Sequence, residues 1–259
     1  MITVAVSREI EFKIPNKTHY SFFNSPYTPH RGSGAIDVYF NDGYALYPLE
    51  EGKVSEIRKI KTPRNINCSE DFLILVDCLN GMFLKILHVE PIVNMGDILY
   101  LGDPLGKLIP SGYFFPWTDL HAHFELRKCG DKYRARGGEK LNPLIIESVP
   151  VAQGEDFVVV EKKDKYCWIK PLHTNPHGLT PISCGMGFVD GGFPHYGYYV
   201  CIGKNLKIHP ANFEVFANGI EIKGLGVYCN FPYVKLIGNH FNEGDVVKIT
   251  CKGDGCPLL

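Results

Sequence analysis

The sequence predicts an all-β protein. Its 259 residues include 27 glycines and 18 prolines, which interrupt the chain at short intervals. The runs between these breaks are rich in β-branched and aromatic residues, as the strands of antiparallel sheets commonly are. No stretch keeps a helical apolar period with capping residues at both ends, so we expect little helix.

The clearest predicted element is a β-hairpin. Its strands cover Phe72–Cys78 and Met82–Val89, and the connection contains the pair Asn80-Gly81, which is typical of tight hairpin turns. A second turn of this kind is expected at Asn218-Gly219. Further strands are predicted, in chain order, at Ala35–Phe40, Gly52–Ile60, Leu120–Arg127, Phe157–Lys162, Tyr198–Ile202, Phe213–Phe216, Ile220–Ile222 and Val246–Cys251.

The length indicates two domains, because single domains commonly contain about 100–150 residues. The segment from Asn142 to Gly154 closes the first half of the chain, and we place the boundary near residue 149. The first domain then spans residues 1–149. The second, residues 150–259, is interpreted as an accessory β-sandwich or barrel of unknown role.

The composition argues against nucleic acid and membrane as partners. A formal net charge of −1, without a stripe rich in lysine and arginine, provides no field to attract a phosphate backbone. No apolar run reaches the ~20 residues that cross a bilayer. The opening segment Met1–Val6 is followed by Arg8, Glu9 and Glu11 in place of the extended apolar stretch of a secretory signal, so a cytoplasmic location is expected.

The cysteine count bears on the redox environment. Nine cysteines, an odd number, are scattered along the chain without a Cys-x-x-Cys motif. We interpret them as buried, reduced thiols of a cytosolic protein, since free cysteine behaves as a small apolar residue. One or two disulfides, such as Cys251 with Cys256, are the alternative that the sequence leaves open.

Alternation within two predicted strands separates polar from apolar side chains. In a strand, side chains two positions apart point to the same face. The polar face of the 120–127 strand carries His121, His123, Glu125 and Arg127, and its apolar face carries Ala122, Phe124 and Leu126. In the 35–40 strand, Asp37 likewise points away from its apolar neighbours, so both strands present metal-binding or catalytic residue types on one face.

The histidines and Asp37 indicate a metal site only as a set. The chain has ten histidines, so the pair His121 and His123 is close to chance expectation by itself, and spacing does not decide which of the two binds a metal. His30, Asp37 and His88 precede this pair, with glycine-marked turns between them. A catalytic zinc site uses three protein ligands and leaves a fourth position to water. Two histidines and one aspartate meet that requirement.

Several landmarks resemble, in chain order, those of the lysostaphin/LytM-type (M23) zinc metallopeptidases over about residues 25–147. They are His30 with Gly34–Asp37, the turn Leu49–Val54, Leu87-His88, Met95–Ile98 with Gly102–Gly106, and His121–Leu126. The resemblance implies a folded-over antiparallel sheet of the duplicated hybrid motif type, with a groove that accepts an extended peptide. It also implies a zinc endopeptidase that hydrolyses peptide bonds, of cell-wall type or glycine-rich, through a metal-bound water.

Carried over residue by residue, the resemblance implies zinc bound by His30, Asp37 and His123. It implies His88 and His121 as the catalytic histidines, which flank the metal-bound water, transfer protons and steady the tetrahedral intermediate. Which of these two does which stays open. Zn²⁺ is the expected cofactor and a peptide the expected substrate.

The first departure from the family pattern concerns the first ligand. Many members place this histidine four residues before the aspartate, a position that Ser33 occupies here, whereas His30 stands seven residues before Asp37. A longer turn over Arg31–Ala35, which two glycines permit, would restore the ligand. Without such a turn the site is inert.

The second departure is the aromatic segment Tyr113–Asp119, interpreted either as a wall for an apolar or cyclic substrate group or as core filling. Glu125 is interpreted as an orienting or structural residue and not as a general base. Two alternatives to a peptidase remain. One is a catalytically inactive M23-like module that binds or activates a partner, and the other is an unrelated β-protein with incidental histidines.

Overall fold

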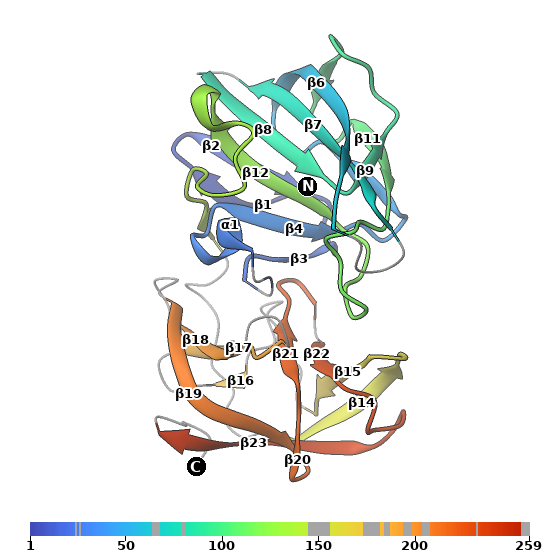
Figure 1. The fold of residues 1–259 in the computed structure, drawn as a ribbon, viewed down its shortest axis with the longest axis vertical. Helices are drawn as coiled ribbons and strands as arrows, with labels where there is room; N and C mark the ends of the chain where they lie inside the picture. The colour runs from blue at the N-terminus through green and yellow to red at the C-terminus, as the bar shows by residue number, and fades with distance from the viewer. Residues whose placement is uncertain are drawn as a thin grey trace. The chain divides into compact units, whose positions relative to one another are not determined.

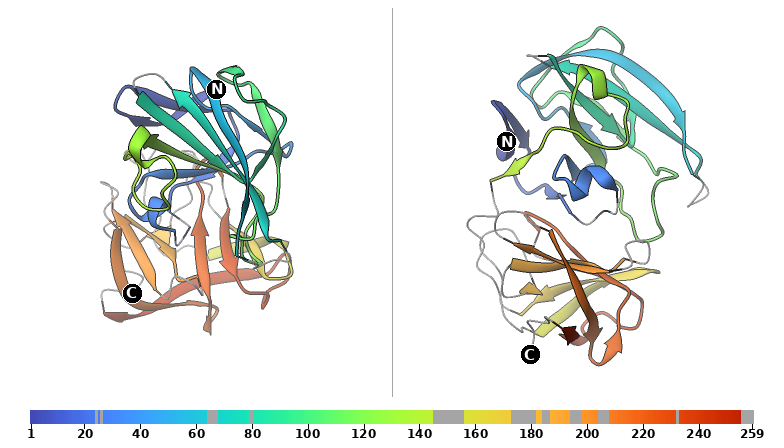
Figure 2. Two further views of the ribbon diagram at one scale, coloured as in Figure 1. Left: turned by 45° about the horizontal axis from the view of Figure 1, so that its top comes forward. Right: turned by 60° about the vertical axis from the view of Figure 1, so that its left-hand side comes forward.

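The computed structural model describes residues 1–23, 25, 27–63, 68–78, 81–144, 156–172, 182–183, 187–193, 198–203, 208–231 and 233–254. The chain divides into two compact units, Met1–Phe22 with Tyr27–Leu144 and Phe23–Pro26 with Ile145–Leu259. Strands dominate both units, which confirms the all-β prediction (Figures 1 and 2). The helical elements are short: α1 covers Thr28–Arg31 and the 3-10 turn η2 covers Cys129–Asp131.

The first unit is built on a seven-stranded antiparallel sheet in the order β10-β6-β7-β8-β12-β4-β3. Its strands are β3 (His19–Ser21), β4 (Ala35–Tyr39), β6 (Glu51–Lys61), β7 (Glu70–Cys78), β8 (Met82–Leu87), β10 (Ile98–Tyr100) and β12 (Ala122–Lys128). The long strands twist and curl, as the blue-to-green ribbons of Figure 2 show.

Two three-stranded sheets complete this unit, in the orders β13-β1-β2 and β5-β11-β9. Their strands are β1 (Ile2–Ser7), β2 (Ile10–Ile14), β5 (Tyr44–Leu46), β9 (Val89–Pro91), β11 (Pro104–Leu108) and β13 (Asn142–Pro143). Because β9 follows β8 directly but belongs to another sheet, the chain changes sheets at the single residue between them.

Strand register gathers the apolar side chains of four neighbouring strands on one face of the large sheet. Phe124 of β12 pairs with Ile86 of β8 on one side and Ile36 of β4 on the other, and Ile86 pairs with Ile74 of β7. All four side chains are fully buried. The opposite face of β12, which carries the polar residues predicted from the alternation, is buried as well. Polar groups there need partners within the protein.

The predicted hairpin is present, but its second strand ends earlier than expected. β7 pairs with β8 from Cys78 and Met82 onward, whereas Asn80 lies outside the described residues. The predicted strand 82–89 is interrupted at His88, whose φ of 67° is incompatible with a continuous ladder. The predicted strand 120–127 begins only at Ala122, so His121 stands just before it. Both histidines therefore lie at strand ends.

The second unit is a ten-stranded sheet in the order β16-β17-β18-β19-β23-β14-β15-β22-β21, with β20 paired to β19. Its strands are β14 (Asp156–Lys162), β15 (Tyr166–Pro171), β16 (Ile182–Ser183), β17 (Gly187–Gly191), β18 (Tyr199–Gly203), β19 (Ile208–Ala217), β20 (Ile220–Glu221), β21 (Gly224–Val227), β22 (Val234–Ile237) and β23 (Val246–Asp254). An additional pairing of β17 with β21 closes the sheet into a barrel. This architecture is one of the two that were predicted.

The turn predicted at Asn218-Gly219 is confirmed. Asn218 has a φ of 50° and Gly219 a φ of 80°, and the flanking residues Ala217 and Ile220 pair across β19 and β20. Two successive positive φ values define the hairpin turn that Asn-Gly favours. The unit change after Leu144 lies close to the predicted boundary, and residues 145–155 lie outside the described part.

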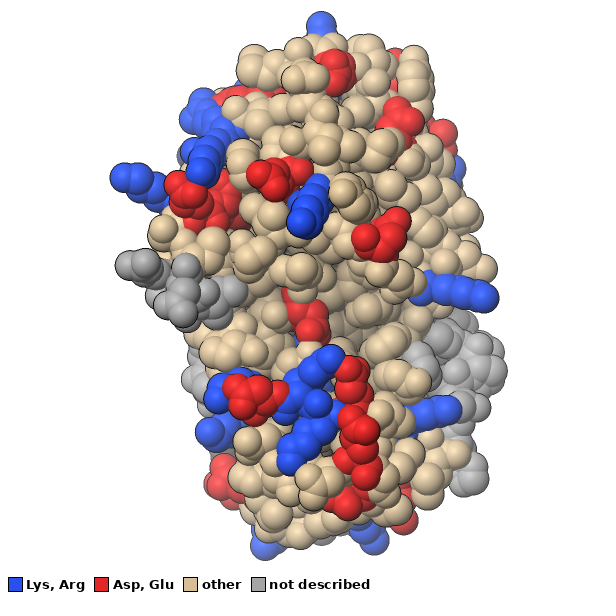
Figure 3. Space-filling view, turned by 90° about the vertical axis from the view of Figure 1, so that its right-hand side faces the viewer, with Lys and Arg blue, Asp and Glu red and all other residues tan. Residues whose placement is uncertain are grey.

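The cysteines are mixed in state. Cys68, Cys78, Cys129 and Cys167 are free thiols, but only Cys78 and Cys167 are buried as predicted, whereas Cys68 is half-buried and Cys129 is exposed. Cys251 is disulfide-bonded, and Cys256 lies outside the described residues. On the face drawn in Figure 3, acidic and basic side chains lie beside one another and neither sign covers a broad area. Within the described residues, no helix has the length and apolar character needed to cross a membrane.

Candidate metal centre

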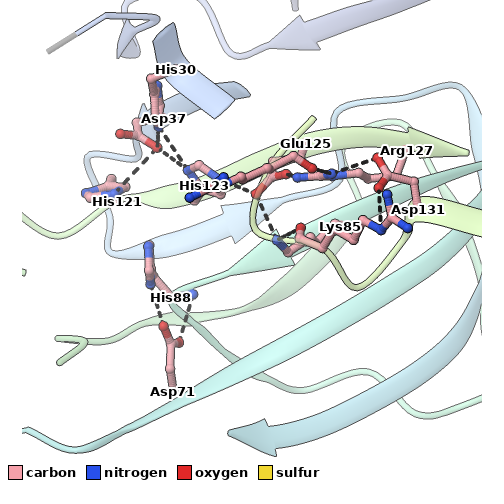
Figure 4. Close-up of polar contacts among 12 residues, drawn as sticks. His30, Asp37, Asp71, Lys85, His88, His121, His123, Glu125, Arg127 and Asp131 are labelled. Carbon is pink, nitrogen blue, oxygen red and sulfur yellow. Dashed lines mark hydrogen bonds and ion pairs between the residues drawn. The ribbon is translucent and has the colours of Figure 1, made fainter. Parts of the chain in front are cut away.

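Three predicted metal ligands come together from separate elements. His30 lies in α1, Asp37 in β4 and His123 in β12, and all three are buried. One potential ligand atom of each lies within 4.8 Å of those of the other two. Figure 4 shows the three side chains pointing toward one another. The structure thus gathers two imidazoles and one carboxylate at a single point.

The register of β4 and β12 brings two of these residues together. Asp37 pairs directly with His123 across the two antiparallel strands, so their side chains leave the sheet on the same face. The Oδ1 of Asp37 lies 2.7 Å from the Nδ1 of His123. Alternation in the sequence placed each residue on a polar face, and the register of the strands turns those two faces into one site.

A short helix followed by a tight turn brings in His30. α1 places the imidazole in the interior, and the chain then turns back through Ser33, whose φ of 56° is left-handed. The carbonyl of Ser33 accepts a hydrogen bond from the N–H of Leu141 at 2.7 Å, and the N–H of Gly34 donates to the carbonyl of Pro29 at 2.8 Å. The helical turn therefore accommodates the seven-residue spacing between His30 and Asp37.

One ring nitrogen of His30 is hydrogen-bonded to the backbone. Its Nδ1–H donates to the backbone carbonyl of Phe22 at 2.9 Å, which leaves Nε2 with a free lone pair. That Nε2 lies 3.3 Å from Oδ1 of Asp37 and 3.2 Å from Nδ1 of His123. The backbone of β3 and the loop after it therefore sets the tautomer that a metal ligand needs.

The second nitrogen of His123 faces a buried carboxylate. Its Nε2 lies 2.9 Å from Oε1 of Glu125, which also accepts a hydrogen bond from Nζ of Lys85 at 2.9 Å. The other oxygen of Glu125 accepts from Nε of Arg127 at 2.7 Å. Glu125 thus orients His123, in agreement with its interpretation as an orienting residue.

Sequence reasoning missed Lys85 and the role of Arg127. Glu125 pairs with Lys85 in the register of β12 and β8, so the two charges face each other across the strands. A single lysine within the apolar strand Met82–Leu87 was the available signal. Arg127 also donates through Nη1 to the carboxylate of Asp131 at 2.9 Å and to the carbonyl of Arg136 at 2.8 Å.

The electrostatics follow from this arrangement. Desolvation alone would raise the pKa of Asp37, but the facing histidines His121, His30 and His123 outweigh it and hold that pKa well below its ordinary value. Desolvation would lower the pKa of His123, whereas hydrogen bonds to Asp37 and Glu125 raise it to about 9. Desolvation would raise the pKa of Glu125, but its contact with His123 outweighs this effect and lowers the pKa to about 2.

The predicted catalytic histidines lie beside this group. The Nδ1–H of His121 donates to the carbonyl of Asp119 at 2.8 Å, and its Nε2 lies 3.6 Å from Oδ1 of Asp37. The ring of His88 stands nearly perpendicular to that of His121, with centroids 5.1 Å apart. Burial, the main cause, lowers the pKa of His121 to about 4, so this imidazole is neutral at neutral pH. Both histidines are nearly buried.

The aromatic segment after Gly112 supports these two rings. Phe114 stacks on His121 with centroids 4.7 Å apart and meets His88 edge-on at the same centroid separation. It is 3% exposed. At Phe114 the core-filling interpretation is therefore confirmed, whereas Tyr113, Phe115 and Trp117 are half-buried.

The donor set fits zinc in type and in two of its three spacings. Zinc binds imidazole nitrogen and carboxylate oxygen at about 2.0–2.2 Å in tetrahedral geometry, which sets neighbouring donors about 3.3 Å apart. The two separations that involve Nε2 of His30 match this value. The third, between His123 and Asp37, is a hydrogen-bond distance. If these three residues bound a tetrahedral metal ion, one position would be left for a water or substrate.

This chain is similar to a solved structure and matches a family model. The NMR solution structure of lysostaphin is similar with a TM-score of 0.32 and 14% sequence identity, over 63% of this chain and 87% of lysostaphin. No match was found among curated proteins. A family model described as "Domain of unknown function (DUF8155) N-terminal domain" matches residues 10–143. This match spans more than half of the chain and includes His30, Asp37 and His123. The chain therefore belongs to the family of the DUF8155 N-terminal domain.

Proposed function

We propose that this chain is a zinc-dependent endopeptidase whose centre is held by His30, Asp37 and His123. The observation that carries the proposal is the convergence of their ligand atoms within 4.8 Å. The Nδ1 of His30 and the Nε2 of His123 each contact an acceptor other than Asp37. The other nitrogen of each imidazole is therefore directed at Asp37. The ordered resemblance of the sequence to M23 metallopeptidases supports the same assignment.

When bound in a group of this kind, zinc lowers the pKa of a coordinated water from 15.7 to about 7 and polarises a carbonyl. Peptide hydrolysis needs a water oxygen to attack the carbonyl carbon and the bond from carbon to nitrogen to break. One proton must leave the water, and one must reach the departing amine. The protein has to supply a group that carries that proton.

His121 and His88 are the residues suited to carry the proton. Each has its Nδ1 next to an oxygen acceptor, which leaves Nε2 as the proton acceptor. A neutral imidazole accepts the proton of the attacking water and then donates it to the amine nitrogen as the bond from carbon to nitrogen breaks. His121 is neutral at working pH because burial lowers its pKa.

Metal content tests the centre itself. Protein purified without chelator is expected to contain about one zinc per chain, measured by mass spectrometry of the metal, and to lose it on dialysis against a chelator. His123→Ala should lose the metal, whereas His240→Ala, a matched substitution at an exposed histidine, should retain it. Two imidazoles and a carboxylate also serve non-haem iron(II) sites, so metal identity is measured directly.

The proposal fails if no zinc co-purifies or can be reloaded and His123→Ala leaves the metal content and the stability of the protein unchanged. An intact metal site without hydrolysis of any peptide favours the alternative of an inactive M23-like module that binds or activates a partner. Oligoglycine, wall peptides and unfolded proteins, each with and without zinc, are the substrates for this screen.

The two flanking histidines should separate catalysis from metal binding. His121→Ala and His88→Ala are expected to keep the metal and to lower peptide hydrolysis by about 10²–10⁴-fold, the usual contribution of a general acid or base. The measurement is kcat with the best substrate of the screen, together with metal content for each variant. Loss of metal in either variant would instead make that histidine a ligand.

A further inference from the structure

A buried carboxylate outside the metal group makes four hydrogen bonds at one point. The Oδ1 of Asp71 accepts from the backbone N–H of Phe72 at 2.7 Å and of His88 at 2.9 Å. Its Oδ2 lies 2.6 Å from Nδ1 of His88 and accepts from the hydroxyl of Ser111 at 2.7 Å. Asp71 is 0% exposed, as is Ser111. Each oxygen therefore has two donors.

The carboxylate of Asp71 holds both the backbone and the ring of His88. His88 adopts a φ of 67°, a conformation that costs energy for a residue with a Cβ and persists only where its surroundings enforce it. One carboxylate oxygen binds its N–H and the other binds its ring, and its carbonyl accepts from the N–H of Ile109 at 3.1 Å. These contacts fix where the imidazole points.

The far edge of the His88 ring faces the candidate metal centre. Its centroid lies 5.1 Å from that of His121 and 5.9 Å from that of His123. Figure 4 shows Asp71 on one side of the ring and these two histidines on the other. Because the carboxylate can only accept at Nδ1, the ring's proton lies there and Nε2 is left with its lone pair.

We propose that Asp71 is a positioning residue that fixes neutral His88 as the tautomer protonated on Nδ1, with Nε2 directed at the candidate metal centre. The catalytic meaning of this assignment rests on the proposed peptidase function. The assignment of the proton stands on the geometry alone. Its analogue in other hydrolases is a buried carboxylate that holds a histidine in the tautomer needed for proton transfer.

The structure specifies what Asp71→Asn must do. The Oδ1 position receives two backbone N–H groups, which can only donate, so the carbonyl oxygen of the asparagine must occupy it. The amide nitrogen is then forced to the Oδ2 position, where it donates toward Nδ1 of His88. His88 must accept there and carry its proton on Nε2. The substitution therefore reverses the tautomer while it keeps the size of the side chain.

Nitrogen-15 NMR of the imidazole nitrogens tests the assignment, because a protonated ring nitrogen and one with a free lone pair have well-separated chemical shifts. Spectra of the full chain are recorded after chelation over a pH series that reaches the neutral ring. His88→Gln identifies the signals of His88. We expect a protonated Nδ1 in the wild type and in Ser111→Ala and Asp77→Asn, and a protonated Nε2 in Asp71→Asn. Asp77 is exposed on the same strand as Asp71, which makes it the matched control.

A wild-type spectrum with the proton on Nε2 overturns the proposal even if Asp71→Asn does not fold. So does an Asp71→Asn spectrum that matches the wild type. With an active enzyme, Asp71→Asn should lower kcat by about 10²–10⁴-fold and leave the metal content unchanged. If the wild type hydrolyses no peptide, the peptidase function fails, and the spectra still decide the position of the proton.

Discussion

Replacing Arg127 with methionine is expected to lower the free energy of unfolding of the first unit by about 3–5 kcal/mol, the usual cost of breaking a buried ion pair by removing one partner. Arg127 is 0% exposed and donates to Glu125, to Asp131 and to the carbonyl of Arg136. Methionine fills a similar volume but offers no donor. The carboxylate of Glu125 would stay buried with Lys85 and His123 as its remaining partners.

Urea unfolding of the metal-free protein measures this cost. The chain has two tryptophans, so a Trp168→Phe background leaves Trp117 to follow the first unit by fluorescence. Arg134→Met is the matched control, because this side chain is 77% exposed and its contact with Asp131 is long, at 3.7 Å. An equal effect of the two substitutions would contradict a stabilising role for the buried network.

A second variant separates the charge from the packing. The single substitution Arg127→Met leaves the buried carboxylate of Glu125 with too few donors. Combining it with Glu125→Gln removes this negative charge. Part of the lost stability should return, because an amide is less costly to bury than an under-paired carboxylate. If the double variant is less stable than Arg127→Met alone, Glu125 contributes mainly through its other partners.

The parts of the site that lie on regular strands were predictable from the sequence. Alternation placed Asp37 on the polar face of one strand and His123 with Glu125 on the polar face of another. Their direct contact depends on the register of β4 and β12, a property of two strands that are far apart in the chain. Pattern in a single strand contains no information about which residue it will face.

The remaining parts depend on local departures from regular structure. His30 reaches Asp37 through one turn of helix and the left-handed Ser33, and the local signals were Pro29 in the first turn and the two glycines that permit a turn. His88 was expected inside a strand and instead interrupts it. Asp71, which holds His88, precedes an apolar run and looks in sequence like an ordinary strand-end residue. Such partners are identified by three-dimensional contacts alone.

Binding of zinc is expected to release a proton from His123. Both of its nitrogens face carboxylate oxygens, Nδ1 at 2.7 Å from Asp37 and Nε2 at 2.9 Å from Glu125. Each carboxylate favours a proton on the nitrogen that it faces, and the pKa of His123 is raised to about 9 as a result. At pH 7 this imidazole is therefore charged, although a metal ligand must offer Nδ1 unprotonated.

The sign of the pH dependence follows directly. A group with a raised pKa keeps its proton below that pKa, so between about pH 9 and pH 6 the metal competes with a bound proton. Apparent zinc affinity should fall by about tenfold for each pH unit of acidification, which amounts to about 100-fold from pH 8 to pH 6. Above about pH 9 the proton is already lost, and this contribution disappears.

Calorimetric titration with zinc at pH 7, in buffers with different ionisation enthalpies, counts the released protons from the dependence of the observed heat on the buffer. The wild type should release about one proton from His123. Glu125→Gln should release less, because removal of the negative charge beside Nε2 lowers the pKa of His123 toward its ordinary value while Asp37 remains. Heats that do not depend on the buffer, or an affinity unchanged between pH 8 and pH 6, would mean that His123 is neutral before the metal binds. Its contact with Asp37 would then be a hydrogen bond from a neutral imidazole and not an ion pair that zinc has to displace.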